Sequence, residues 1–98
     1  MSSIKKLSLS EVSKKVQKYP KWSLNTKGTE ISRTFLFSNF VNALSFVAKV
    51  TVHAEILEHH PDIELSYGKV KVILSTHDVK GLTVKDFDLA KKIDGLQI

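Results

Sequence analysis

The 98-residue chain has the length of one domain, and its 42% hydrophobic and 26% charged residues are typical of a globular protein rather than a disordered chain. It contains no cysteine, which excludes disulfides, thiolate catalysis and cysteine-ligated metal centres. The net charge of +5 comes from residues 1–49, which carry nine Lys or Arg and two acidic residues, whereas residues 50–98 carry six and eight. With one arginine among scattered lysines, a solvated lysine face explains this charge better than direct nucleic-acid binding.

Residues 1–98 are expected to form a single domain that folds alone. No apolar run in the sequence suggests a membrane span of roughly 18 to 20 residues, and residues 1–6 do not resemble a signal peptide. Together with the absence of cysteine, this favours a reducing cell interior.

The first half of the chain predicts one helix and two strands. Ser8 and Glu11 form a capping box, apolar residues follow at helical spacing, and Pro20 ends the helix. Residues 22–24 and 31–37 are rich in aromatic and β-branched residues, and the turn-prone residues 25–28 lie between them. This pattern predicts two antiparallel strands.

A long helix is predicted from about residue 39 towards residue 59. Asn39 is a suitable N-cap, and Pro61 closes the segment. Between them, side chains four, seven and eight residues apart fall on one face: Phe40, Leu44, Val47, Ala48, Thr51 and Glu55.

A hairpin and a last helix complete the expected order αββαββα. Residues 63–67 and 70–74 alternate around Gly68, which predicts the hairpin. Thr83 as N-cap, with Asp86 three positions later, starts a helix that reaches about residue 94. This order favours an α+β fold in which three helices pack on one face of a four-stranded antiparallel sheet.

The histidines point to the functional region. All four lie between residues 53 and 77, in the less basic half. Glu55 and His59 are four residues apart near the end of the predicted helix, so they are expected to share a face. His77 follows a predicted strand and can converge on the same place. Imidazoles near a carboxylate and a helix end suit acid/base chemistry near neutral pH.

Structural explanations compete with this hypothesis. His59 before Pro61 also fits a helix C-cap, and Asp86 is explained by its place in a capping box. His53 has no partner pattern and is expected at the surface, and the sequence lacks the ligand spacing of a specific metal motif. The aromatic residues are expected in the core or an interface: Trp22, Phe35, Phe37 and Phe40.

The order of these residues resembles the pterin-4a-carbinolamine dehydratase family. The resemblance rests on Glu55-x3-His59-His60-Pro61, Tyr67, Leu74-Ser75-Thr76-His77 and Gly81-Leu82-Thr83-x2-Asp86, and it extends over nearly the whole chain. It implies loss of water from 4a-hydroxytetrahydropterin to give quinonoid dihydropterin, which recycles the cofactor of aromatic amino acid hydroxylases. It implies no metal and no redox cofactor.

By resemblance, His59, His60 and His77 are the catalytic histidines. His59 and His77 act as acid and base at the hydroxyl, and His60 holds the pterin and assists proton transfer. Glu55 orients His59, and Asp86 supports the site. The implied substrate-binding residues are Glu58, His59, His60, Ser75, Thr76, His77 and Asp78.

The family also implies partners. Its members form homodimers that pair into homotetramers, and an exposed edge strand offers a physical route to the dimer. Some members act as dimerisation cofactors of a homeodomain transcription factor, which implies a nuclear as well as a cytoplasmic location. On that alternative reading as a binding module, the long helix presents Phe46, Val47 and Val50 on an exposed face. Direct binding to nucleic acid or to membranes is not expected.

Overall fold

A computed structural model describes residues 5–96; residues 1–4, most of the segment compared above with a signal peptide, and residues 97–98 lie outside this range. The elements are α1 (Leu9–Val16), β1 (Ser23–Leu24), β2 (Ile31–Leu36), α2 (Phe40–Leu57), β3 (Asp62–Ser66), β4 (Lys69–Leu74) and α3 (Val84–Asp94). The predicted α+β class and the order αββαββα are confirmed. A short 3-10 turn that was not predicted, η1 (His77–Val79), lies between β4 and α3.

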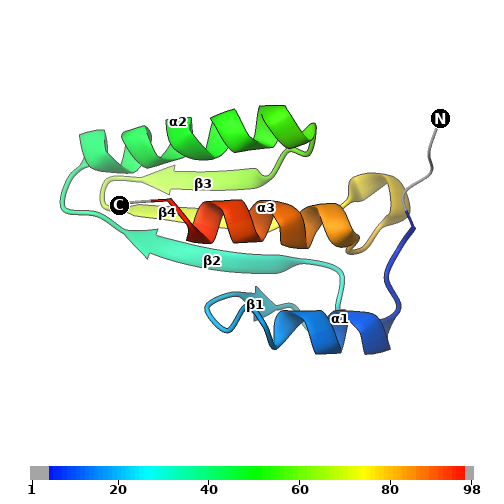
Figure 1. Cartoon of the computed structure of the whole chain (residues 1–98). Helices are drawn as coiled ribbons and strands as arrows, with labels where there is room; N and C mark the ends of the chain where they lie inside the picture. Colours follow the sequence, from blue (N-terminus) through cyan, green and yellow to red (C-terminus); the bar gives the residue numbers. More distant parts are fainter. Residues whose placement is uncertain (1–4, 97–98) are drawn as a thin grey trace.

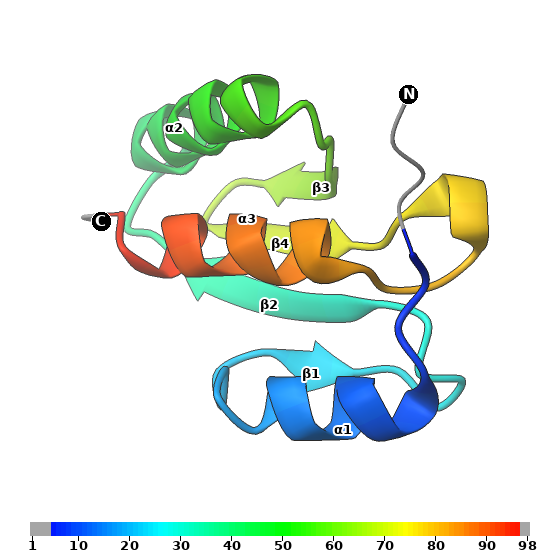
Figure 2. The same ribbon diagram turned by 45° about the vertical axis from the view of Figure 1, so that its right-hand side comes forward.

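The four strands form one antiparallel sheet in the order β1-β2-β4-β3. The helices lie on one face of this sheet (Figure 1, Figure 2). At the sheet centre, Ile31 lies opposite Leu74 and Phe35 lies opposite Val70, and all four side chains are buried. Because side chains alternate along a strand, this register directs one apolar row of each central strand towards the helices.

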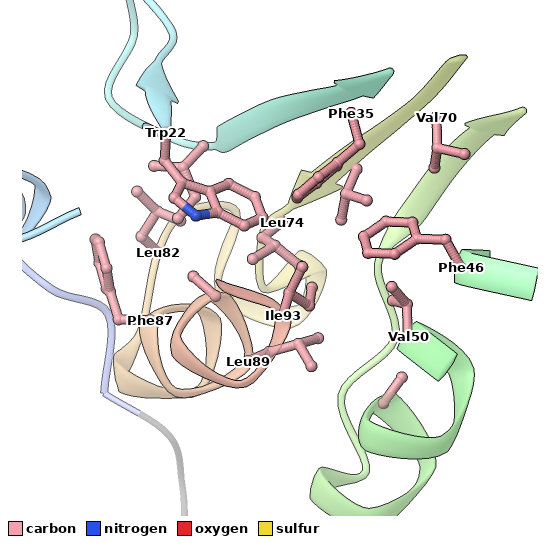
Figure 3. Packing of buried hydrophobic residues seen from close by; sticks show 14 of the residues in the cluster. Trp22, Phe35, Phe46, Val50, Val70, Leu74, Leu82, Phe87, Leu89 and Ile93 are labelled. Carbon is pink, nitrogen blue, oxygen red and sulfur yellow. The ribbon is translucent and has the colours of Figure 1, made fainter. Parts of the chain in front are cut away.

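The core fills the space between the sheet and the helices, with aromatic rings at several junctions (Figure 3). Phe46 of α2 packs against Phe35 of β2, with ring centroids 4.5 Å apart. Tyr19, which follows α1, packs against Phe87 of α3 at 5.4 Å. These contacts attach each helix to the sheet or to a neighbouring helix, which fixes where the helix ends lie.

Helix α2 places its two faces differently from the prediction. Its buried side chains are Ala43, Phe46, Val50 and Ala54. The prediction that Phe46, Val47 and Val50 lie on an exposed face is therefore wrong, because Phe46 and Val50 belong to the core and Val47 is half-buried. The large apolar side chains exposed on α2 are instead Phe40, Val41, Leu44, Val52 and Ile56. Since both faces are apolar, periodicity alone does not identify the buried one.

By length and composition alone, α2 is the one helix within residues 5–96 that is long and apolar enough to cross a membrane. No such segment was predicted from the sequence, because polar residues interrupt the apolar stretches of α2. The helix contains polar residues along its length, and one of its faces packs into the core, as in a half-buried helix of a globular domain.

Candidate active site

Four segments meet at one end of the molecule. The C-terminal end of α2, the start of β3, η1 and the start of α3 lie together in both views (Figure 1, Figure 2). His59, His60 and His77 come from these segments, and each has a carboxylate beside it. The structure therefore brings the predicted histidines to the same end of the fold, although their environments differ.

The end of α2 determines where the first two histidines point. Glu58 adopts the left-handed conformation with φ of 51°, which a residue with a side chain adopts at a cost of about 1 kcal/mol. The N–H of Glu58 donates to the carbonyl of Glu55 (3.2 Å), and the N–H of His59 donates to the carbonyl of Ala54 (3.0 Å). These two bonds end the helix in a Schellman motif, so His59 lies beyond the helix and no longer follows its spacing.

His59 is buried against the start of α3. Its Nε2 lies 2.5 Å from Oδ1 of Asp86, although 27 residues separate the two in sequence. The other carboxylate oxygen, Oδ2, accepts hydrogen bonds from the hydroxyl of Thr76 (2.8 Å) and from the backbone N–H of Thr83 (2.9 Å). The side chain of His59 is 9% exposed and that of Asp86 is fully buried. This carboxylate therefore serves both as the predicted cap partner of α3 and as the partner of a site histidine.

The predicted pairing of Glu55 with His59 is wrong. The carboxylate of Glu55 instead contacts His60, with Oε2 at 2.5 Å from Nε2. The reason is the turn at Glu58, because the expected contact required the helix to continue through residue 59. Both side chains of the observed pair are about two-thirds exposed, so water screens their attraction.

His77 lies on η1, beside a carboxylate that sequence reasoning missed. Its Nε2 is 3.6 Å from Oδ2 of Asp62, the first residue of β3, and both side chains are about two-thirds exposed. Asp62 follows Pro61, so this ion pair also places His77 near the segment that carries His60. A carboxylate at the start of an edge strand is common, and nothing in the sequence pattern distinguishes Asp62 from its neighbours.

The remaining predicted binding residues differ in how far their side chains are exposed. Glu58 and Asp78 are exposed and Ser75 is half-buried. Thr76 is buried, and its hydroxyl is engaged by Asp86 and by the hydroxyl of Thr83 (2.8 Å). Thr76 thus contributes to the support of the site, whereas the other three present polar groups towards its surface.

Two hollows of the surface lie away from His59, His60 and His77. One, of about 740 Å³, is lined by residues around the start of α1, and the other, of about 590 Å³, lies between α2 and α3. His53 lines the second hollow and is half-buried, so the prediction of a plain surface residue is only partly right. Within residues 5–96 there is no group of three or more His, Asp or Glu side chains placed to hold a metal ion. The histidine cluster itself is an open surface with one buried ring at its base.

Such an arrangement can transfer protons. A buried imidazole held by a carboxylate has a fixed orientation, and two exposed imidazoles can reach a bound molecule from the solvent side. General acid/base catalysis needs groups of this kind within reach of the atoms that gain and lose protons.

Comparisons with known proteins identify the family of the chain. The family model described as pterin 4 alpha carbinolamine dehydratase matches residues 5–96. A protein of Picosynechococcus sp. named "Putative pterin-4-alpha-carbinolamine dehydratase" is 47% identical over 93% of this chain and 97% of its own length. A relative of the same name from Sulfurisphaera tokodaii is 46% identical over 95% of this chain and 98% of its own length.

A solved structure shares the fold closely. The crystal structure of a transcriptional coactivator/pterin dehydratase from Brucella melitensis has a TM-score of 0.85 and 32% identity, covering 92% of this chain and 96% of that one. A pterin dehydratase-like protein described as a RuBisCO assembly factor has a TM-score of 0.63 and 17% identity, which shows likeness of fold alone. With a family match across almost the whole chain and relatives at nearly half identity, this protein belongs to the pterin-4a-carbinolamine dehydratase family.

Proposed function

We propose that this protein dehydrates 4a-hydroxytetrahydropterin to quinonoid dihydropterin by histidine acid/base catalysis. The observation that carries the proposal is the meeting of His59, His60 and His77 at one end of the fold, each beside a carboxylate, in a chain of this family. Family membership supports the dehydratase activity, and the histidine cluster supports its mechanism.

The reaction requires two proton transfers. The C4a–O bond breaks and the hydroxyl group leaves as water after it gains a proton, while N5 loses its proton and the C4a–N5 double bond forms. One imidazole in its protonated form supplies the first proton, and one in its neutral form takes the second. The protons balance, so the residues return to their starting states after exchange with solvent.

The three histidines suit different parts of this task. His59 is held in place by Asp86, so it suits a transfer that depends on a fixed position. His77 and His60 are exposed and can approach the pterin from the open side. We assign the acid and base roles to His59 and His77, and pterin binding with assistance in proton transfer to His60. Glu58, Ser75 and Asp78 supply polar contacts around them, and Glu55 contacts His60.

The test measures breakdown of the carbinolamine generated in situ by a phenylalanine hydroxylase and followed by absorbance. Wild type should accelerate the reaction, and His59→Ala and His77→Ala should each lower turnover by about 10²-fold or more. His53→Ala is the matched control. His53 is a histidine of α2, and it lines the hollow between α2 and α3. Normal turnover in both site variants would refute the assigned roles.

A second candidate function, a protein-binding module, is favoured by the outer face of α2. Phe40, Leu44, Val52 and Ile56 recur at helical spacing along this 18-residue helix and are 44–71% exposed. Unpartnered apolar stripes of this length mark interaction surfaces. We propose that a second copy of the chain covers the stripe, since a two-fold axis lets the same apolar face pack on itself.

The oligomer is tested separately from the activity. Sedimentation equilibrium should give a multiple of the chain mass for wild type and a smaller species for Leu44→Glu, because a buried unpaired charge opposes the contact. Leu9→Glu, at a leucine on α1 that is 68% exposed against 50% for Leu44, is the control. A monomeric wild type would refute the oligomer. An oligomeric protein without dehydratase activity would favour the binding module as its function.

A further inference from the structure

The buried hydrogen bonds behind His59 form a chain with a defined direction. The hydroxyl of Thr76 donates a hydrogen bond to Oδ2 of Asp86. A hydroxyl has one proton, so the contact of 2.8 Å between the hydroxyls of Thr76 and Thr83 requires Thr83 to be the donor. The backbone N–H of Thr83 also donates to Oδ2. Both threonines and Asp86 are buried, so water does not compete for these bonds.

This chain leaves one oxygen of Asp86 for the histidine. Two donors already occupy Oδ2, and Oδ1 faces Nε2 of His59 at 2.5 Å. An ionised carboxylate accepts hydrogen bonds and donates none. The ring nitrogen that faces Oδ1 must therefore carry a proton, which for a neutral imidazole leaves Nδ1 with the lone pair. Within residues 5–96, no side chain or carbonyl forms a hydrogen bond with Nδ1.

We propose that Thr83 and Thr76 are positioning residues that act through Asp86 to keep the proton of neutral His59 on Nε2, so that Nδ1 is the nitrogen that exchanges protons with the substrate. The role of Nδ1 rests on the proposed dehydratase function, whereas the placement of the ring proton does not. Neither threonine touches the pterin on this account, because their hydroxyls are used inside the protein.

The test combines a spectroscopic reading of the ring with turnover. Protein labelled with ¹⁵N-histidine is compared for wild type, Thr76→Val, Thr83→Val and the serine variants of both positions. Wild type should show His59 protonated at Nε2 and unprotonated at Nδ1, with a sharp Nε2–H proton signal. Valine keeps the shape and removes the hydroxyl, so Asp86 loses an anchor, the Nε2–H signal broadens and the nitrogen shifts average.

Turnover should follow the spectrum. Loss of one buried hydrogen bond predicts that kcat falls about fivefold to tenfold in Thr76→Val, and less in Thr83→Val because Thr83 acts through Thr76. The serine variants retain the hydroxyl and should restore both the signal and kcat. Thermal unfolding of each variant establishes that the compared samples are folded.

Two results would overturn the proposal. One is a wild-type spectrum with the neutral proton of His59 on Nδ1. The other is a folded Thr76→Val variant whose nitrogen shifts and kcat match wild type. An inactive wild type with the proton on Nε2 and shifts that respond to valine would overturn the dehydratase function and the role of Nδ1 in it, while supporting the positioning by the threonines.

Discussion

Replacing Asp86 by asparagine exchanges donor and acceptor in the hydrogen bond to His59, with almost no change in the shape of the side chain. The amide oxygen can occupy the place of Oδ2 and accept the same two donors, the hydroxyl of Thr76 and the N–H of Thr83. The amide NH₂ then faces Nε2 of His59 and donates to it, so Nε2 becomes the acceptor. The proton of the neutral ring moves to Nδ1, and the nitrogen available to the substrate loses its lone pair.

The structure gives separate magnitudes for stability and activity. All the hydrogen bonds can be kept, but three of them lose the charge of the carboxylate, which we expect to cost about 1–2 kcal/mol in total. For a domain of this size each kcal/mol lowers Tm by roughly 4–8 °C. Turnover should fall by about 10²-fold or more, because a histidine held in the wrong tautomer cannot act as base at the required position.

The assay is the carbinolamine reaction at fixed protein concentration, accompanied by thermal unfolding and ¹⁵N spectra of the histidine ring. Asp86→Ala is the comparison, since it leaves three buried partners unpaired and should lose several kcal/mol. Asparagine should thus separate loss of activity from loss of stability, whereas alanine causes both. If the folded Asp86→Asn variant turned over substrate within twofold of wild type, the reasoning about the ring proton would be refuted.

Three further predictions concern the rest of the fold. Phe46→Ala should lower the free energy of unfolding by about 3–5 kcal/mol in denaturant, because Phe46 is buried against the sheet. Phe40→Ala, at a 44% exposed position, should lower it far less in the monomer. Equal losses would contradict the assignment of the two faces of α2. Glu55→Gln removes an exposed partner of His60, so Tm should change little while KM rises, and a large loss of Tm would contradict the solvent screening of this pair. The pKa of Glu11 is held below its ordinary value of 4.5 by hydrogen bonds within the capping box of α1, so its carboxylate stabilises the fold above that pH; wild type should be more stable than Glu11→Gln at pH 7, and the difference in Tm should disappear as pH falls below 4.5 through the lowered pKa.

Local signals in the sequence predicted most elements correctly. The capping box of Ser8 and Glu11 is present, with bonds of 2.8 and 3.1 Å, and Asn39 caps α2 through a bond of 2.8 Å to the N–H of Asn42. These motifs act within three residues, so the chain around them determines the outcome. The hairpin around Gly68 follows the same rule, because alternation specifies both strands and their register.

What the sequence could not predict depends on contacts between distant segments. The residue type at position 58 gives no sign that it turns left-handed, yet that turn transfers Glu55 from His59 to His60. The partnership of His59 with Asp86 spans 27 residues, and the capping explanation of Asp86 accounted for one of its oxygens while leaving the other unassigned. For α2, two apolar faces left the choice of the buried face to the packing of Phe46 on the sheet.

The burial of the three histidine–carboxylate pairs determines what removal of one partner does to each pair. The contact between His59 and Asp86 is buried, so either partner without the other leaves an unpaired polar group in the interior, and the orientation of the ring is fixed before any substrate arrives. The pairs of His60 and His77 are about two-thirds exposed, so water replaces a lost partner and the rings can turn towards a bound molecule. Removal of the carboxylate should therefore reduce kcat strongly at Asp86 and act mainly on KM at Glu55 and Asp62. A kcat loss at Asp62→Asn as large as that at Asp86→Asn would mean that the orientation of His77 is also fixed by its partner, despite the exposure of both side chains.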